Sequence, residues 1–379
     1  MDILSMPQIQ EINMNRRIFI EKLLNGFKTM ALLSTLPPSK LMAVTDSLKG
    51  EKHYKPLNGR SLKDISLNKV HHDGKGRYVN PIGLPRHGRL WQVMSWKLFH
   101  QNDFKKYFAG EKEKPVSINW DPIRQHRGLS ITFLKHASVM IKDIDRYIVI
   151  DPVFSEIFWF IRDFTPLSFD LKQMPRPHQV LVTHGHYDHL DKPSLSWLAK
   201  DTRFVSPLGY NNVFKDLKIT HRTQMDWYDT IHDGGQEITL LPCNHWTMRN
   251  PLVGPNRSLW GSYLIKTIGG FTIYISGDTA YFDGFRQIGE QYKIDLAVFN
   301  LGAYEPRWFM APSHINPRET VQAFKELKAE KILIVHWGTF RLGDEPVHFP
   351  PLQIRQELRQ QGLLDRLVDL KHGESYFPA

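Results

Sequence analysis

Cysteine is almost absent from this chain: Cys243 is the only one among 379 residues. A single cysteine can form neither an intramolecular disulfide nor a cysteine-rich zinc module. Small domains stabilised by disulfides or by cysteine-bound zinc are therefore excluded. Cys243 lies two residues before His245, and on a strand both side chains would face the same side. It could be a spare metal ligand, but a small buried hydrophobic residue is the simpler interpretation.

Long apolar runs are also missing. No stretch reaches the roughly 18 apolar residues that a membrane-spanning helix needs, so we expect no such helix. Overall, 41% of the residues are hydrophobic and 23% are charged, which is ordinary for a globular protein. This composition excludes collagen-like and intrinsically disordered classes, and the length suits one large domain or two modest ones.

Acidic residues are fewer than basic ones, 39 against 49, and the net charge is +10. Such an excess favours an anionic partner, which could be a phospholipid head group or a nucleic acid. The charge by itself does not choose between these partners, and an ordinary basic surface is a further alternative.

The N-terminus resembles a twin-arginine export signal around Arg16 and Arg17. Asn15 stands where such signals usually have serine or threonine, and Lys28 interrupts the apolar stretch that follows. The alternative is a basic amphipathic helix that lies on the protein or on a membrane. We assign residues 1–43 to a possible export signal. If it acts, the protein is expected in a bacterial periplasm or on the periplasmic face of the membrane; otherwise it is cytoplasmic and membrane-associated.

Residues 183–191 contain three histidines and two aspartates. An apolar, β-branched stretch at 179–182 precedes them and predicts a buried strand, and residues 192–198 predict a helix with proline in its first turn. The cluster therefore follows the end of a strand, where open α/β layers place their chemistry. Imidazoles and carboxylates suit zinc and similar divalent ions, which favours a metal site over a polar surface turn. The candidate ligands here are His184, His186, Asp188 and His189.

Three later residues, identified as candidates by the family resemblance given below, also follow predicted strands. His245 comes after residues 237–242, Asp278 after residues 271–275 and His336 after residues 331–335. Because every candidate follows a strand, all seven side chains are expected to converge on one site.

The pattern His-x-His-x-Asp-His, with the later histidines and aspartate in this order and approximate spacing, resembles the metallo-β-lactamase superfamily. The resemblance runs from about residue 129 to the C-terminus. It implies an α/β fold, the αββα four-layer sandwich, over residues 129–379, and we interpret residues 44–128 as an extension that wraps this core. It also implies two Zn²⁺ ions, although other divalent metals are possible. The implied ligands are His184, His186 and His245 for one ion, Asp188, His189 and His336 for the other, and Asp278 as a bridge.

Within this superfamily, the aspartate at 278 resembles the phosphodiesterase, thioesterase and lactonase branches. The chain is most similar to phospholipases D that hydrolyse N-acylphosphatidylethanolamine and to their bacterial relatives. The matching segments are residues 133–138, 150–154, 183–191, 244–246, 277–280 and 336–340. The resemblance implies a di-zinc phosphodiesterase that releases N-acylethanolamine and phosphatidic acid, with a membrane surface as partner. It assigns catalytic roles to Asp188, Asp278 and His314; the alternative for His314 is an exposed loop histidine.

Two other functions stay open at this stage. Several matching segments also occur in sugar-lactone hydrolases, so a lactone or other ester hydrolase is the second option. A nuclease or nucleic-acid-binding protein is the third, suggested by the net charge of +10. Nothing resembles a known RNA-binding module, and we therefore expect no nucleic-acid partner.

For two further stretches the sequence leaves alternative roles open, and only a structure can choose between them. Residues 157–169 are rich in aromatics and should contact a membrane or an acyl chain, or else pack beneath the N-terminal extension. His71 and His72 could bind metal, but they have no partner nearby in sequence, so we favour a surface or packing role.

Overall fold

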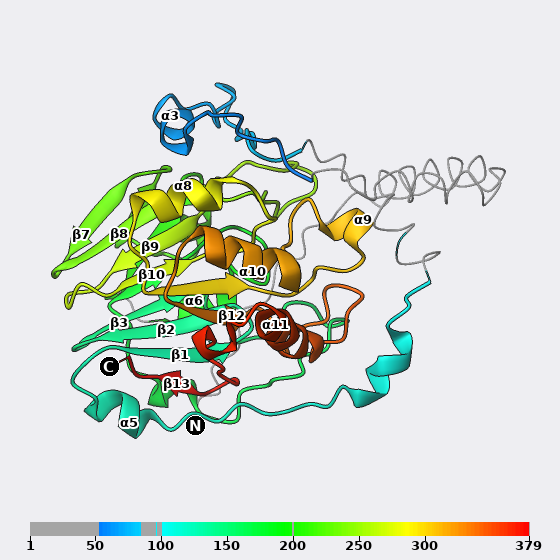
Figure 1. Ribbon diagram of the computed structural model, residues 1–379. Helices are drawn as coiled ribbons and strands as arrows, with labels where there is room; N and C mark the ends of the chain where they lie inside the picture. Colours follow the sequence, from blue (N-terminus) through cyan, green and yellow to red (C-terminus); the bar gives the residue numbers. More distant parts are fainter. Residues whose placement is uncertain (1–52, 85–95, 97–100, 199–200, 379) are drawn as a thin grey trace, which may run out of the picture. The chain divides into compact units, whose positions relative to one another are not determined.

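The computed structural model describes residues 53–84, 96, 101–198 and 201–378 (Figure 1). The possible export signal lies outside the described residues. Residues 52–86 and 102–379 form one compact unit, and the description below concerns this unit. The predicted boundaries at residues 43 and 128 stay predictions.

The first sheet has seven strands in the order β13-β1-β2-β3-β4-β5-β6. Strands β13, β1, β2 and β3 pair antiparallel, whereas β3, β4, β5 and β6 pair parallel. The strands are β1 (Ser130–Lys135), β2 (Ser138–Asp143), β3 (Arg146–Ile150), β4 (Gln179–Leu181), β5 (Arg203–Pro207), β6 (Arg222–Met225) and β13 (Ser375–Tyr376).

The second sheet has six strands in the order β12-β11-β10-β9-β8-β7. Strands β7 to β10 pair antiparallel, and β10, β11 and β12 pair parallel. The strands are β7 (Thr230–Asp233), β8 (Gln236–Leu241), β9 (Ser262–Lys266), β10 (Thr272–Ile275), β11 (Leu296–Asn300) and β12 (Lys331–Val335).

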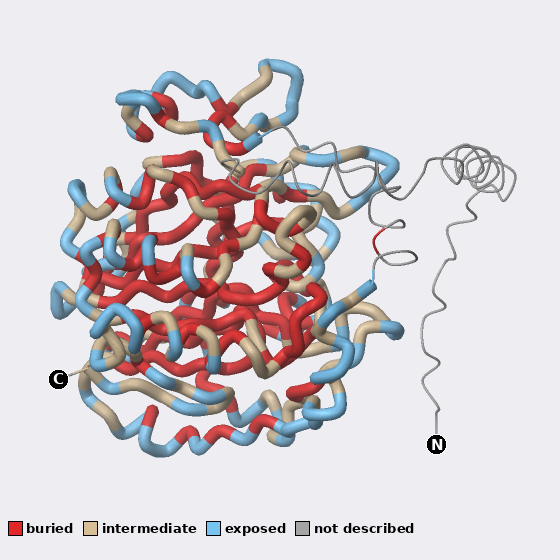
Figure 2. The backbone as a smooth tube through the Cα atoms, turned by 45° about the vertical axis from the view of Figure 1, so that its right-hand side comes forward, coloured by how far each residue is buried: buried red, intermediate tan, exposed pale blue. Residues whose placement is uncertain are grey.

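Three apolar cores separate four layers. The middle core joins alternate residues of both sheets, among them Ile141 of β2 and Ile273 of β10. The helices described are α3 (Leu62–Leu67), α5 (Trp120–Gln125), α6 (Lys192–Trp197), α7 (Asn211–Asp216), α8 (Gly284–Gln291), α9 (Arg307–Met310), α10 (Pro317–Glu326) and α11 (Phe349–Gln360), with short 3₁₀ turns at Lys105–Gly110, Leu171–Gln173 and Leu364–Arg366. Helices α5, α6 and α7 pack on the outer face of the first sheet, and α8, α10 and α11 on that of the second. This confirms the predicted αββα sandwich, and Figure 2 shows the buried interior of the strands.

Local sequence explains the helices that support the candidate site. Asp191 caps α6 by accepting a hydrogen bond from the backbone N–H of Ser194, and Pro193 stands in the first turn. Asn316 and Glu319 form a reciprocal capping box at the start of α10. Helices α3, α5, α8, α9 and α11 and strands β6, β7 and β13 were not among the elements predicted from the sequence.

A few apolar side chains of residues 53–84 pack into the core beside the second sheet. Leu57, Leu62 and Ile65 are buried against the helices of the second sheet. The backbone N–H of Leu57 donates to Asp283 at 3.0 Å, and that of Leu62 donates to Gln287 at 2.8 Å. Within the described ranges, no helix is both long and apolar enough to cross a membrane.

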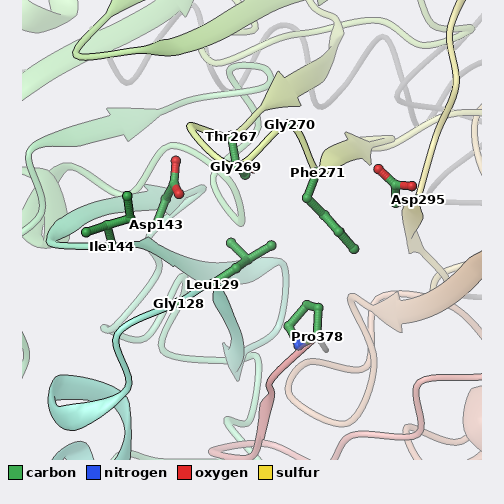
Figure 3. A pocket seen from close by; sticks show the side chains of 10 residues that line it. All are labelled: Gly128, Leu129, Asp143, Ile144, Thr267, Gly269, Gly270, Phe271, Asp295 and Pro378. Atoms are coloured by element: carbon green, nitrogen blue, oxygen red, sulfur yellow. The ribbon is translucent and has the colours of Figure 1, made fainter.

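A pocket of about 470 Å³ lies where β10 and β11 begin (Figure 3). Two of its lining residues are carboxylates, Asp143 and Asp295. Asp143 accepts hydrogen bonds from Gln236 and from the N–H of Ile268, both at 2.8 Å, and Asp295 accepts one from the N–H of Thr272 at 2.7 Å. These carboxylates hold the strand connections together, at the opposite ends of the strands from the candidate ligands.

Candidate metal centre

All seven predicted ligands lie together, just beyond the carboxyl ends of strands from both sheets. Together with His136, which was not among the seven, they form two adjoining groups of four, and in each group the possible ligand atoms lie within 4.8 Å of one another. The groups are His184, His186, His245 and Asp278, and His136, Asp188, His189 and His336. The convergence is a property of the structure, while the role of each residue as a ligand stays a prediction.

The first group brings three imidazoles together in edge-to-face arrangements. His186 Nδ1 lies 2.9 Å from His184 Nε2 and 3.3 Å from His245 Nε2. Asp278 Oδ2 lies 3.9 Å from the Nε2 atoms of both His184 and His245. Ring nitrogens that face one another at these distances direct lone pairs at a common point, which a cation between them would stabilise.

The second group uses the other oxygen of the same aspartate. Asp278 Oδ1 lies 3.2 Å from His189 Nε2 and 3.3 Å from His336 Nε2. Asp188 Oδ2 is 3.3 Å from His336 Nε2 and 3.6 Å from His189 Nε2. Each oxygen of Asp278 thus faces a different group, which is the arrangement a bridging carboxylate needs.

The titration of these groups suits metal ligands. Burial alone would raise the pKa of Asp278, but His189 and His336 outweigh it and hold the pKa well below its usual value. The same balance of burial against His189 and His136 lowers the pKa of Asp188. Burial lowers the pKa of His184, and its histidine neighbours lower it further, so this imidazole stays neutral. Ionised carboxylates and neutral imidazoles are the forms that bind divalent ions.

His189 provides the test of whether a metal fits. Among the described residues, its fully buried Nε2 forms no aligned hydrogen bond, although Asp278 Oδ1 lies 3.2 Å away. Burial would lower the pKa of His189, but Asp278, Asp188 and Asp151 raise it well above the usual value. Three carboxylates around one buried ring call for positive charge, which a divalent cation supplies better than a single proton. The donor set therefore fits a pair of divalent ions.

A further shell of contacts orients the candidate ligands. Asp151 Oδ2 lies 2.7 Å from His189 Nδ1, while the N–H and hydroxyl of Thr183 donate to Asp151 at 2.7 and 2.6 Å. The side-chain amide of Asn300 donates to Asp278 Oδ1 at 3.0 Å. Such partners fix ring orientation and ligand basicity. Asp151 was not among the predicted site residues, although it directly follows β3 as the ligands follow their strands.

His136 was also missed. It directly follows β1, is fully buried, and places Nε2 3.1 Å from Asp188 Oδ2. Burial lowers its pKa to about 3, and the nearby His336 adds to this shift. A neutral His136 donates to Asp188 and holds this carboxylate toward the second group. The signal in the sequence was its position directly after a predicted strand, which it shares with the predicted ligands.

His314 lies at the edge of the first group rather than on a remote surface loop. Its Nδ1 is 3.8 Å from Asp278 Oδ2, and 15% of its side chain is exposed. Arg307 donates to the His314 carbonyl at 2.9 Å and forms a bidentate pair with Glu319 at 2.9 and 2.8 Å. The loop histidine is therefore held in place beside the metal groups.

The aromatic stretch at 157–169 divides into two parts. Phe164 is buried, but Trp159 is 91% exposed and Phe160 is 64% exposed. The ring of Phe158 lies 5.3 Å from that of Phe160 and 4.9 Å from that of Tyr187, which belongs to the metal motif. Packing explains Phe164, whereas Trp159 and Phe160 form an exposed apolar rim beside the metal groups.

His71 and His72 meet a partner distant in sequence. Asp226 Oδ1 lies 2.6 Å from His71 Nε2, and Asp226 Oδ2 lies 2.9 Å from His72 Nε2 and 2.6 Å from the ammonium of Lys69. His71 is buried and stacks on Trp227 at 4.2 Å. Two imidazoles and a carboxylate could hold a cation, but the ammonium of Lys69 already forms an ion pair with this carboxylate. We name Lys69, His71, His72 and Asp226 the Asp226 clasp.

Cys243 is buried, with 1% of its surface exposed. Its thiol donates to the carbonyl of Asp278 at 3.5 Å, and burial raises its pKa well above the usual value. This confirms the interpretation of Cys243 as a small buried residue.

Two sheets between helices, with paired histidine and aspartate groups at one edge, define a metal-dependent hydrolase of the αββα class. The family model described as "Beta-lactamase superfamily domain" matches residues 146–337, half of the chain. The protein therefore belongs to the β-lactamase superfamily.

Curated relatives agree with this assignment. The chain is 29% identical over 330 residues to "N-acyl-phosphatidylethanolamine-hydrolyzing phospholipase D 1" of Caenorhabditis elegans, covering 82% of this chain and 90% of the relative. It is 32% identical over 232 residues to the mitochondrial enzyme of the same description from Saccharomyces cerevisiae, covering 58% of this chain and 49% of that one. Among solved structures, an isothiocyanate hydrolase from Delia radicum gut bacteria superimposes with a TM-score of 0.55 at 18% identity, covering 65% of this chain and 98% of that one. The last likeness shows the shared fold alone.

Proposed function

We propose that the protein is a di-zinc phosphodiesterase of the phospholipase D type that cleaves N-acylphosphatidylethanolamine. The observation that carries this proposal is the Asp278 carboxylate between two histidine groups, with the exposed Trp159 and Phe160 close by. A phospholipid presents a phosphodiester to the polar centre and acyl chains to an apolar rim. The names of the two curated relatives support this substrate class.

Two divalent ions held by these groups would supply a water of lowered pKa and polarise the phosphoryl oxygens. Asp188 and Asp278 would stay ionised and hold the centre together, while Asp151 and His136 fix the orientation of His189 and Asp188. His314 is the residue placed to protonate the departing oxygen, because its ring is partly exposed beside Asp278. In the overall reaction, the oxygen of water joins phosphorus and the N-acylethanolamine leaves with a proton, so that phosphatidic acid remains.

Membrane association is part of the proposal. Trp159 suits the interfacial zone of a bilayer, where its amphipathic ring is favoured. The net charge of +10 would draw the protein toward anionic lipids. Phe158 links the rim to Tyr187 of the metal motif, so a docked bilayer would lie beside the centre.

The test is a substrate panel on the zinc-loaded protein. N-acylphosphatidylethanolamine, a short soluble phosphodiester, a sugar lactone and a single-stranded RNA are assayed under the same conditions, with chelator-treated protein as control. We expect metal-dependent release of N-acylethanolamine and slow turnover of the soluble phosphodiester. Metal-dependent hydrolysis of the lactone alone would replace the proposal with the ester-hydrolase alternative.

A further inference from the structure

The segment that precedes the catalytic core reaches the candidate metal centre through Asn80. Its side-chain amide Nδ2 donates to the carbonyl of His245 and to Asn244 Oδ1, both at 2.9 Å. Its Oδ1 accepts from the N–H groups of Ile82 at 3.1 Å and Gly83 at 2.8 Å. One side chain thus joins the turn at 80–83 to the backbone of a predicted ligand.

The surroundings of Asn80 leave little room for movement. Ile82 and Asn244 are fully buried. A methyl group at Gly83 would collide with the amides of both Asn80 and Asn244, so the backbone can approach this closely only with glycine. The hydrogen bonds of Asn80 therefore belong to a closely packed contact and not to an exposed surface.

A second chain of hydrogen bonds runs from the same segment to the other side of the centre. The N–H of Tyr78 donates to the Asn256 carbonyl at 2.8 Å, and Asn256 exchanges two hydrogen bonds with Thr247 at 2.7 and 3.1 Å. The hydroxyl of Thr247 accepts from the N–H of Gly185, which stands between His184 and His186, at 3.0 Å. The support therefore reaches His245 directly and the backbone between His184 and His186 through Thr247.

The Asp226 clasp holds the N-terminal end of the segment at 69–83. Lys69, His71 and His72 all bond to Asp226, and burial of His71 against Trp227 keeps water away from one side of the carboxylate. The stretch from 69 to 83 is thus held both at β6 and at the His245 loop.

We infer that Asn80 is a positioning residue of the metal centre, which holds the His245 loop at the distance that the first metal group needs. The inference rests on the proposed metal binding. The segment at 69–83 lies outside the matched family region at 146–337, so this support comes from a separate part of the chain. Loss of the amide donor should loosen His245 without disturbing the second group.

The informative variant is Asn80→Asp. Aspartate keeps the size of the side chain and the oxygen that accepts from Ile82 and Gly83, but it replaces the donor to the His245 carbonyl with a second acceptor. Asn80→Ala removes both halves of the contact. The matched control is Ser61→Ala, which removes a helix-capping hydrogen bond in the same part of the chain, from the N–H of Asp64 at 3.2 Å, without touching the metal loops.

The test measures metal binding directly. Each protein is titrated with Co²⁺ against a competing chelator, its visible absorption spectrum is recorded, and its thermal unfolding is followed. We expect both Asn80 variants to bind one of two ions roughly 10- to 100-fold more weakly, as is usual for lost outer-shell partners, with a changed cobalt spectrum. Ser61→Ala should keep wild-type affinity and spectrum.

Three results would overturn the inference. Asn80→Asp could bind both ions with wild-type affinity and spectrum, which would show that the amide does not position the site. Ser61→Ala could weaken binding as much as the Asn80 variants do, which would reduce the effect to general stability. Finally, wild-type protein that binds no Co²⁺ or Zn²⁺ would remove the metal proposal and this inference with it.

Discussion

The exposed rim makes the sharpest prediction. In the double variant Trp159→Ala with Phe160→Ala, two side chains that are 91% and 64% exposed are lost. Neither is buried in the folded protein, so their removal should change the free energy of unfolding by less than about 0.5 kcal/mol. On a bilayer, both side chains would leave water.

The magnitude follows from the area that lipid would cover. Burying one large apolar side chain contributes about 1.5–3 kcal/mol, and the exposed fractions of these two residues leave most of that contribution still to be gained. Together they should stabilise the vesicle-bound state by about 3 kcal/mol. Since about 1.4 kcal/mol corresponds to a factor of ten, vesicle binding should weaken roughly 100-fold.

The assay compares binding and turnover on two substrates. Sedimentation with anionic vesicles gives the binding constant, and activity is measured on vesicles and on a short soluble phosphodiester. We expect vesicle binding and vesicle turnover to fall together, while turnover of the soluble compound and the unfolding temperature are unchanged. Phe164→Ala is the matched control from the same stretch: this residue is 2% exposed, and its loss should destabilise the fold by about 3–5 kcal/mol. If the double variant behaves like Phe164→Ala, with a much lower unfolding temperature and both activities lost, the rim is part of the core and the membrane role is refuted.

Three further predictions concern the centre, the N-terminus and acid stability. Asp278→Asn removes the charge that faces both histidine groups, so metal content should fall and turnover should drop more than about 100-fold; full metal content with an unchanged rate would contradict the bridging role. Arg16→Lys with Arg17→Lys should leave the protein in the cytoplasm if the export signal acts, and cell fractionation that shows an unchanged location would exclude it. Burial lowers the pKa of His372 to about 4, so the unfolded chain binds the proton more readily and stability should fall as the pH drops from about 6.5 to 4. In urea denaturation, His372→Gln should lose less stability than wild type between pH 7 and pH 5, and equal losses would show that His372 does not contribute.

Much of the centre could be predicted because its chemistry is local. His184, His186, Asp188 and His189 fall within six residues after an apolar strand, and that density of ligand types has few explanations other than a metal. His245, Asp278 and His336 each follow a β-branched stretch, and parallel or mixed sheets gather such strand ends at one edge. The fold class followed from the resemblance to the metallo-β-lactamase superfamily, with which the predicted strands and helices agree.

The sequence by itself therefore determined the sandwich, the predicted ligands and their common edge, while the tertiary structure decided what surrounds them. Asp226 lies 155 residues from His71, and no local pattern connects them. The aromatic stretch at 157–169 shows no period that separates the buried Phe164 from the exposed Trp159. Asp151 and His136 form hydrogen bonds to predicted ligands that follow another strand of the first sheet, and Asn80 bonds to the loop of His245 after a strand of the second sheet. These contacts join residues that are distant in sequence, so they appear only in the folded structure. The sequence gives the chemical type of each side chain. Contacts between residues that are distant in sequence depend on strand register and on the packing of the folded layers.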